Sequence, residues 1–338
     1  MEIRMKIKIS ILVILLLLIS GLSYAKDRQG IVTFKINLNT QKGSANARLW
    51  LPYPLSEEHQ RIEDLTIQGD FNNSSIYREQ ESGAIYHFSE WQGDSDTKTL
   101  EMSFKVNAEE RIVKDLRDTN APVPDEVKKY LKSNWWIPTE GRIKEIANKI
   151  TKDKKGILEK SRAVYDWVVE NTHRDPGVKG CGLGIVEQVL IKRGGKCVDL
   201  SSVYIALARS AGVPAREVFG IRLGKKAEQD ITGGYHCWAE FFLPGTGWIP
   251  VDPADVRKMM LVENLSLKEA EKYREYYFGA VDEFRIALER SGRGLKLLPL
   301  QESGPLNYLM YPYAEIDGKP LDHLDPESFN YTVTFKAI

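Results

Sequence analysis

The sequence predicts an α+β protein with a small antiparallel β-sandwich on its N-terminal side. Two observations lead to this fold class. Residues 30–112 alternate apolar and polar side chains between frequent turn residues, which is the pattern of half-buried antiparallel strands. From Val123 the apolar period lengthens to that of helices, and strand patterns return only from Glu217. Helices followed by strands describe a second domain of the α+β class.

The first 25 residues are predicted to be a secretory signal peptide. Three basic residues lie within Met1–Lys8, an apolar run covers Ile9–Ile19, and the small-x-small sequence Ser23-Tyr24-Ala25 follows. The run is too short to span a membrane stably, which favours a cleaved signal peptide. The alternative is an uncleaved N-terminal anchor. We therefore expect an exported protein, periplasmic or secreted, whose only membrane contact would be that anchor.

Length and charge limit the organisation and the partners. Without residues 1–25, the 47 basic and 47 acidic residues fall to 44 and 46, a formal charge of −2. This balance does not indicate nucleic acid or an anionic membrane surface as the main partner. The remaining length suggests two domains. We expect the sandwich over 26–120, the second domain over 121–294 and a C-terminal β extension over 295–338.

The sandwich strands are predicted from alternation. Apolar residues occupy every second position around Phe34 and again around Phe104, and the stretch Arg48–Leu51 ends at a proline. The C-terminal extension shows the same pattern around Tyr331, after an Asp317-Gly318 turn. Alternation alone leaves open whether this extension joins the sandwich or the sheet of the second domain.

The helices of the second domain are predicted from apolar residues spaced three and four apart. A short helix opens at Pro124, a second contains Ile143–Ile150, and a third covers Ile157–Asn171. The next helix begins at Cys197 and ends at Gly212, since a proline two positions later prevents its continuation. The strands that follow are expected at Glu217–Ile221, Tyr235–Phe242 and Trp248–Val251.

The chain contains three cysteines, Cys181, Cys197 and Cys237. An exported protein that relied on disulfides would contain more, usually an even number. The odd count therefore indicates at least one free thiol. Cys181 lies in a glycine-rich loop, and three possibilities are open for it. It could pair with another cysteine, lie near the site or be an ordinary loop residue. No spacing of cysteine and histidine fits a zinc site, so we expect no metal and no cofactor.

Cys197 is the candidate nucleophile, because it follows Gly194-Gly195-Lys196 at the predicted start of a helix. The unpaired N–H groups and the dipole of a helix N-terminus stabilise a thiolate, which is the reactive form. The glycines allow a substrate to approach, so Gly195 is a candidate substrate-binding residue. The backbone N–H of Cys197 is a candidate oxyanion donor. The alternative is a small buried cysteine at the start of a core helix.

His236 and Asp252 are the candidate base and orienting residue. The order Cys, His, Asp is that of a thiol nucleophile, its base and its orienter. If Phe242 and Thr246 flank a three-residue loop, His236 lies directly opposite Asp252, with Cβ atoms about 5 Å apart on one face. Each residue also has a structural alternative when taken singly. His236 could be a structural histidine whose hydrogen bonds are satisfied, and Asp252 could cap a turn.

The same register places the neighbouring residues. Trp238 would lie opposite Pro250, and Trp238 and Trp248 would wall a substrate site, with packing inside the hairpin as the alternative. Strand alternation puts Cys237 on the face opposite His236, which predicts a core position.

Three separated motifs resemble the transglutaminase-like superfamily, in its bacterial exported branch. They are Gly195-Lys196-Cys197 with Ala206–Arg216, His236–Glu240, and Pro244–Pro253. They lie within residues 140–255, in the order that the family has. The chain departs from the family pattern at His173, where tyrosine is frequent, and at Ala254, where threonine is frequent.

The resemblance implies a papain-like core with Cys197 as nucleophile, His236 as base and Asp252 as orienter. It also implies attack on an amide to form a thioester, as in a cysteine protease, amidase or acyltransferase, and leaves the second oxyanion donor unplaced. No acidic calcium loop is present, so we favour hydrolysis or exchange over cross-linking. The expected partner is a protein or peptide substrate, with cell-wall peptide as one candidate. The alternative is a non-catalytic cell-envelope binding or scaffold module that keeps the fold.

Overall fold

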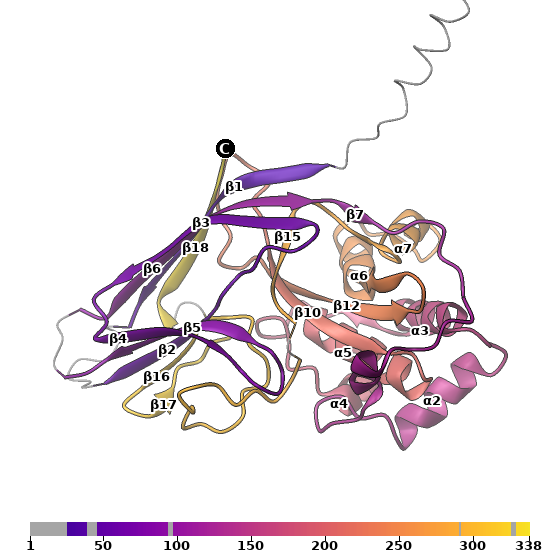
Figure 1. Cartoon of the computed structure of the whole chain (residues 1–338). Coiled ribbons are helices and arrows are strands. Elements are labelled where there is room, and N and C mark those ends of the chain that lie inside the picture. Colours follow the sequence, from indigo (N-terminus) through magenta and orange to yellow (C-terminus); the bar gives the residue numbers. More distant parts are fainter. Residues whose placement is uncertain (1–25, 39–45, 94–96, 291, 326–328) are drawn as a thin grey trace, which may run out of the picture.

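The computed structural model describes residues 26–38, 46–93, 97–290, 292–325 and 329–338. The predicted signal peptide lies outside these residues. Figure 1 shows a β-rich part, to which both ends of the described chain belong, beside a part that contains the helices. Among the described residues, no helix is both long and apolar enough to cross a membrane.

Two five-stranded antiparallel sheets form the β-rich part, and the predicted β-sandwich is confirmed. The N-terminal region contributes β1 (Asp27–Asn37), β2 (Ala47–Pro52), β3 (Gln60–Gly69), β4 (Asn73–Arg78), β5 (Ile85–Trp91) and β6 (Thr99–Glu109). β1 pairs with β6 along its whole length, with Phe34 opposite Met102. Every second residue through the middle of both strands is buried, as the alternation predicts.

The C-terminal strands complete this sandwich and do not extend the sheet of the second domain. β18 (Tyr331–Ala337) pairs with β1, and β16 (Tyr313–Ile316) pairs with β2 and with β17 (Lys319–Pro320). β11 (Glu228–Asp230), from the middle of the chain, pairs with β18 at the edge of the first sheet. The strand orders are β11-β18-β1-β6-β3 and β17-β16-β2-β5-β4. Both ends of the described chain therefore build the sandwich.

The second part has a four-stranded antiparallel sheet in the order β13-β12-β10-β15. Its strands are β10 (Ala215–Arg222), β12 (Tyr235–Leu243), β13 (Gly247–Val251) and β15 (Arg285–Glu289). Two short pairs lie beside it: β7 (Arg111–Ile112) with β14 (Ala280–Val281), and β8 (His173–Arg174) with β9 (Gly194–Gly195). The helices are η1 (Asp125–Leu131), α2 (Arg142–Thr151), α3 (Ile157–Asn171), α4 (Val186–Lys192), α5 (Cys197–Ser210), α6 (Pro253–Val262) and α7 (Glu271–Tyr276).

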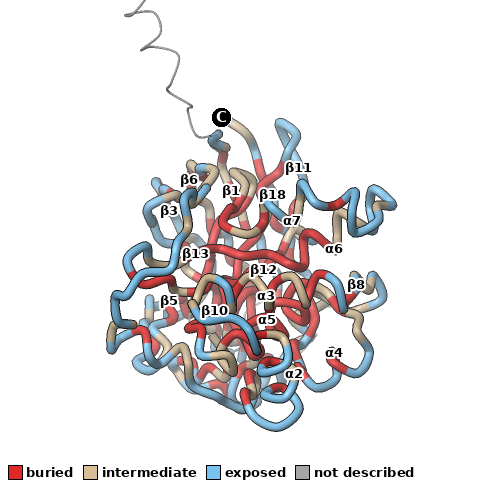
Figure 2. The backbone as a smooth tube through the Cα atoms, turned by 90° about the vertical axis from the view of Figure 1, so that its right-hand side faces the viewer, coloured by how far each residue is buried: buried red, intermediate tan, exposed pale blue. Residues whose placement is uncertain are grey.

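α5 is the central helix of this part. It contacts β10 and β12 of the sheet and also α2, α3, α4 and α6. Every residue from Cys197 to Ala208 is buried, because other elements cover the helix on all sides (Figure 2). The helix ends where Gly212 adopts φ +83°, a value that glycine tolerates, before Pro214. The first residue of α5 therefore lies inside the domain.

Candidate active site

Cys197 is the first residue of α5, and it is only 1% exposed. Asp199 holds the turn before it: the carboxylate accepts the N–H of Lys196 at 3.0 Å and that of Gly184 at 2.8 Å. A Cβ on Gly195 would lie 2.5 Å from the Cβ of Asp199, so this close approach requires glycine. Cys197 thus lies at a helix N-terminus, as predicted, where unpaired N–H groups favour a thiolate.

His236 lies in β12, and Asp252 is the N-cap of α6. Nε2 of His236 and Oδ2 of Asp252 are 2.7 Å apart, and both side chains are buried. The other carboxylate oxygen of Asp252 accepts the backbone N–H of Asp255 at 2.9 Å. The same aspartate therefore caps a helix and holds the imidazole, so the two alternatives for this residue are both present.

The predicted hairpin register is wrong by one residue on each strand. Leu243 pairs with Gly247, which leaves a three-residue loop one position later than expected, and Glu240, not Trp238, lies opposite Pro250. Gly247 adopts φ +108°, which only glycine tolerates easily, and it can therefore close the loop. The sequence offers two glycines in this turn and does not show which of them ends it.

The His236–Asp252 contact forms although the predicted register is wrong, and the reason is geometric. The shift moves each partner by two positions, which keeps every side chain on its predicted face. His236 is then offset diagonally from Asp252 and is not its direct partner. β13 ends at Val251, and the chain turns at Asp252 into α6, which brings the carboxylate to the imidazole.

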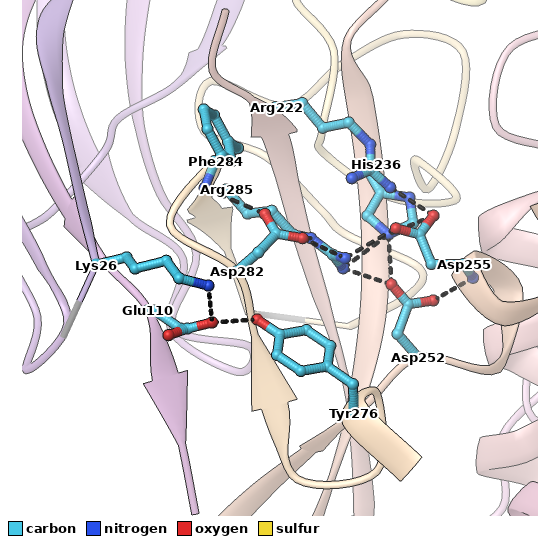
Figure 3. A network of polar contacts seen from close by, with 10 residues as sticks. All are labelled: Lys26, Glu110, Arg222, His236, Asp252, Asp255, Tyr276, Asp282, Phe284 and Arg285. Atoms are coloured by element: carbon cyan, nitrogen blue, oxygen red, sulfur yellow. Dashed lines mark hydrogen bonds and ion pairs between the residues drawn. The ribbon is translucent and has the colours of Figure 1, made fainter. Parts of the chain in front are cut away.

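A buried ion-pair network surrounds this pair (Figure 3). Nη1 of Arg285 donates to Oδ2 of Asp252 at 2.5 Å and lies 3.2 Å from Nε2 of His236. Nη2 of the same guanidinium donates at 2.8 Å to a carboxylate oxygen of Asp255 and to one of Asp282. One fully buried arginine thus links three carboxylates to the imidazole.

Arg222 completes the network, because its Nη2 donates to Oδ1 of Asp255 at 2.5 Å. The sequence pattern did not predict Arg222, Asp255, Asp282 or Arg285 as site residues. Two signals were available. Asp255 lies three residues after Asp252 in the first turn of α6, and Arg285 begins a strand whose residues are otherwise mostly apolar. A charge in a buried strand requires a partner.

Among the described residues, His236, Asp252 and Asp255 place donor atoms close enough together to share a metal ion. Arg285 and Arg222 already donate to these two carboxylates at 2.5–2.8 Å. A cation would therefore meet two guanidinium groups. We assign the carboxylates to ion pairs with the arginines.

The electrostatics of the site favour a thiolate beside an imidazolium. Burial opposes the charged form of Cys197, but hydrogen bonds with Cys181, Cys237 and His236 and the charge of His236 hold the pKa of the Cys197 thiol well below its usual value. Burial and Arg222 lower the pKa of His236, but the nearby aspartates outweigh them and raise it. Both shifts favour a proton on the imidazole of His236 over one on the sulfur of Cys197.

All three cysteines meet at this point. Cys237 is fully buried, as predicted, and its thiol also lies beside that of Cys197. Cys181 also lies beside Cys197, and its thiol donates to the carbonyl of Tyr235 at 3.2 Å. The three are free thiols. Of the possibilities left open for Cys181, the structure selects a place next to the candidate nucleophile.

Trp238 and Trp248 line a groove of about 510 Å³ between the sandwich and the four-stranded sheet. The groove reaches the Arg285 side chain, but Cys197 does not line it. The rings of Trp238 and His236 are stacked with centroids 6.3 Å apart. Trp238 therefore adjoins the imidazole, and both tryptophans line this groove. The other polar residues of the groove include Glu57, Gln60, Arg111, Arg216, Glu240 and Arg290.

Comparisons with known proteins found similar sequences and a similar fold. The model of the transglutaminase-like superfamily matches residues 144–253, which include Cys197, His236 and Asp252. An uncharacterized protein of Haemophilus influenzae is 35% identical over 331 aligned residues, covering 89% of each chain. A protein-glutamine gamma-glutamyltransferase of Pseudomonas aeruginosa is 32% identical over 78 residues, 21% of this chain and 11% of that protein. A solved chain from Cytophaga hutchinsonii, described as a candidate cysteine protease, shares the fold: it covers 92% of this chain and 99% of its own, with a TM-score of 0.53 and 14% identity.

Proposed function

Because the chain belongs to the transglutaminase-like superfamily, we propose that it is a cysteine enzyme that transfers acyl groups from peptide or side-chain amides. One observation carries this proposal. Cys197 begins α5 close enough to His236 for the imidazole to lower the pKa of the thiol, and Nε2 of His236 is 2.7 Å from Oδ2 of Asp252. A thiol nucleophile, a base and a group that orients the base are the parts that acyl transfer through a thioester needs.

In the proposed reaction each part has one role. The thiolate of Cys197 attacks the amide carbon, and the backbone N–H of the same residue is placed to stabilise the developing oxyanion. His236 uses Nε2 toward Asp252, so its Nδ1 is the nitrogen that gives a proton to the leaving amine. The product is a thioester and a free amine. Water or a second amine then attacks the thioester and releases Cys197.

We favour water as the second acceptor, which makes the reaction a hydrolysis, with amine exchange as the other outcome. The first 25 residues support export to the periplasm or beyond, so a peptide of the cell envelope is the substrate class we propose. Cys197 and His236 are 1% and 3% exposed. A substrate must therefore displace the side chains that cover them, and its binding is coupled to opening of the site.

The test is to incubate the purified chain, and its Cys197→Ala variant, with glutamine-containing peptides, with and without a labelled amine. Release of ammonia or of a peptide that requires Cys197 supports hydrolysis, and incorporation of the label supports amine exchange. Iodoacetamide reactivity gives an independent readout of the thiolate. If neither product forms and Cys197 reacts no faster than an ordinary thiol, the proposal fails and a non-catalytic envelope module remains.

A further inference from the structure

The proposed mechanism uses one sulfur, yet every cysteine of the chain lies at the same place. The side chains of Cys181 and Cys237 both lie beside that of Cys197. They come from different elements: Cys181 precedes α4 by several residues, whereas Cys237 lies in β12. Three cysteines in 338 residues would rarely meet by chance, and neither neighbour belongs to the proposed triad.

The two neighbours differ in how firmly they are held. Cys237 lies in a central strand, paired with β10 opposite Phe219, and is fully buried. Cys181 lies between Gly180 and Gly182, at φ +55° and +95°, in a loop without helix or strand. A glycine on each side gives Cys181 backbone freedom that a paired strand denies to Cys237.

Cys181 is also tied to the start of α5 by the backbone. Its carbonyl accepts the N–H of Val198, the residue after Cys197, at 3.0 Å. This bond keeps the two cysteines side by side, so a small movement of the loop brings one sulfur to the other. A disulfide needs a close approach and a suitable torsion angle, which a glycine-flanked loop reaches more easily than a strand does.

We propose that Cys197 and Cys181 form a reversible disulfide when a hydroperoxide oxidises the site, with Cys181 as the resolving thiol. The thiolate of Cys197 attacks the distal peroxide oxygen, the O–O bond breaks, and the products are a sulfenic acid on Cys197 and an alcohol, or water if the oxidant is hydrogen peroxide. The thiol of Cys181 then attacks the sulfenic sulfur and water leaves. Two thiols lose two electrons and two protons, and the peroxide gains them.

This disulfide would switch off acyl transfer, because the nucleophile is consumed, and would protect Cys197 from irreversible oxidation to the sulfinic acid. A thiol reductant restores both thiols by exchange. The inference rests on the same thiolate as the proposed function. It does not require that an amide be the substrate, so the two can fail separately.

The test oxidises the full chain with hydrogen peroxide and maps its peptides without reduction by mass spectrometry. We expect a Cys181–Cys197 cross-link that dithiothreitol removes, and no lasting dimedone adduct on Cys197. In Cys181→Ala, dimedone should label Cys197, and more peroxide should give the sulfinic acid, which dithiothreitol does not reverse. Cys237→Ala is the matched control and should still form the cross-link.

Activity with a glutamine peptide gives a second readout. After peroxide treatment, dithiothreitol should restore nearly all activity of the unaltered chain and less than about one tenth of that of Cys181→Ala. The peptide map of the unaltered chain decides the matter even if a variant fails to fold or no amide substrate is found. A cross-link between Cys197 and Cys237, or a stable sulfenic acid on Cys197 beside a free Cys181, overturns the proposal.

Discussion

Replacing Arg285 with methionine should destabilise the fold strongly. The side chain is fully buried, and its guanidinium donates to Asp252, Asp255 and Asp282. Methionine fills much of the volume but removes the positive charge. Arg222 still neutralises Asp255, whereas Asp252 and Asp282 lose the guanidinium that donates hydrogen bonds to them.

The magnitude follows from the cost of an uncompensated buried charge. Breaking a buried ion pair by removing one partner costs about 3–5 kcal/mol. Asp252 keeps the imidazole of His236 as a partner, and the Asp282 side chain is 19% exposed, so we expect a loss near the lower end of this range. Arg285→Lys keeps the charge, but one ammonium group cannot reach three carboxylates. We expect it to lose about 1–3 kcal/mol, roughly the value of one charge-assisted hydrogen bond.

The assay is urea unfolding, read as the free energy of unfolding at an unchanged dependence on urea concentration. Arg78→Met is the matched control, because Arg78 is an exposed arginine of β4 and the same substitution there should change stability by less than about 0.5 kcal/mol. If Arg285→Met unfolds at the same urea concentration as Arg78→Met, the carboxylates do not depend on this arginine and our account of the network is refuted.

Three further predictions concern the site itself. Asp252→Asn should lower kcat on a glutamine peptide about 10²–10⁴-fold, because it releases the imidazole. The control Asp153→Asn, at an exposed position, should leave kcat unchanged. Equal kcat values for the two variants would exclude Asp252 from the triad. The pKa of Cys197 is lowered, so its thiolate persists below the usual thiol pKa of about 8.5. The alkylation rate of Cys197 should therefore stay nearly constant from pH 8.5 to 7, while that of a free cysteine falls. A parallel fall of the two rates would contradict the thiolate–imidazolium pair. Gly195→Ala places a Cβ 2.5 Å from that of Asp199 and should lower the free energy of unfolding by about 1–3 kcal/mol, measured by thermal denaturation. An unchanged Tm would show that the backbone of this turn adjusts to the added Cβ without loss of stability.

The sequence predicted those features of the fold and the site that depend on local pattern. Alternation and helical spacing predicted the sandwich strands and the start of α5 at Cys197, since each reflects side chains within one element. The face shared by His236 and Asp252 was also predictable, because strand alternation does not change when a register shifts by two. The register itself was not, since either glycine of the turn could end the loop.

What the sequence by itself determined is the set of reactive groups and their local settings: a cysteine after two glycines at a helix start, a histidine in a strand, and an aspartate where a strand gives way to a helix. Tertiary structure alone decided which distant groups surround them. Arg285 reaches Asp252 from another strand, β18 from the end of the chain completes the sandwich, and Cys181 and Cys237 approach Cys197 from a loop and a strand. These contacts join residues far apart in sequence, and only packing brings them together.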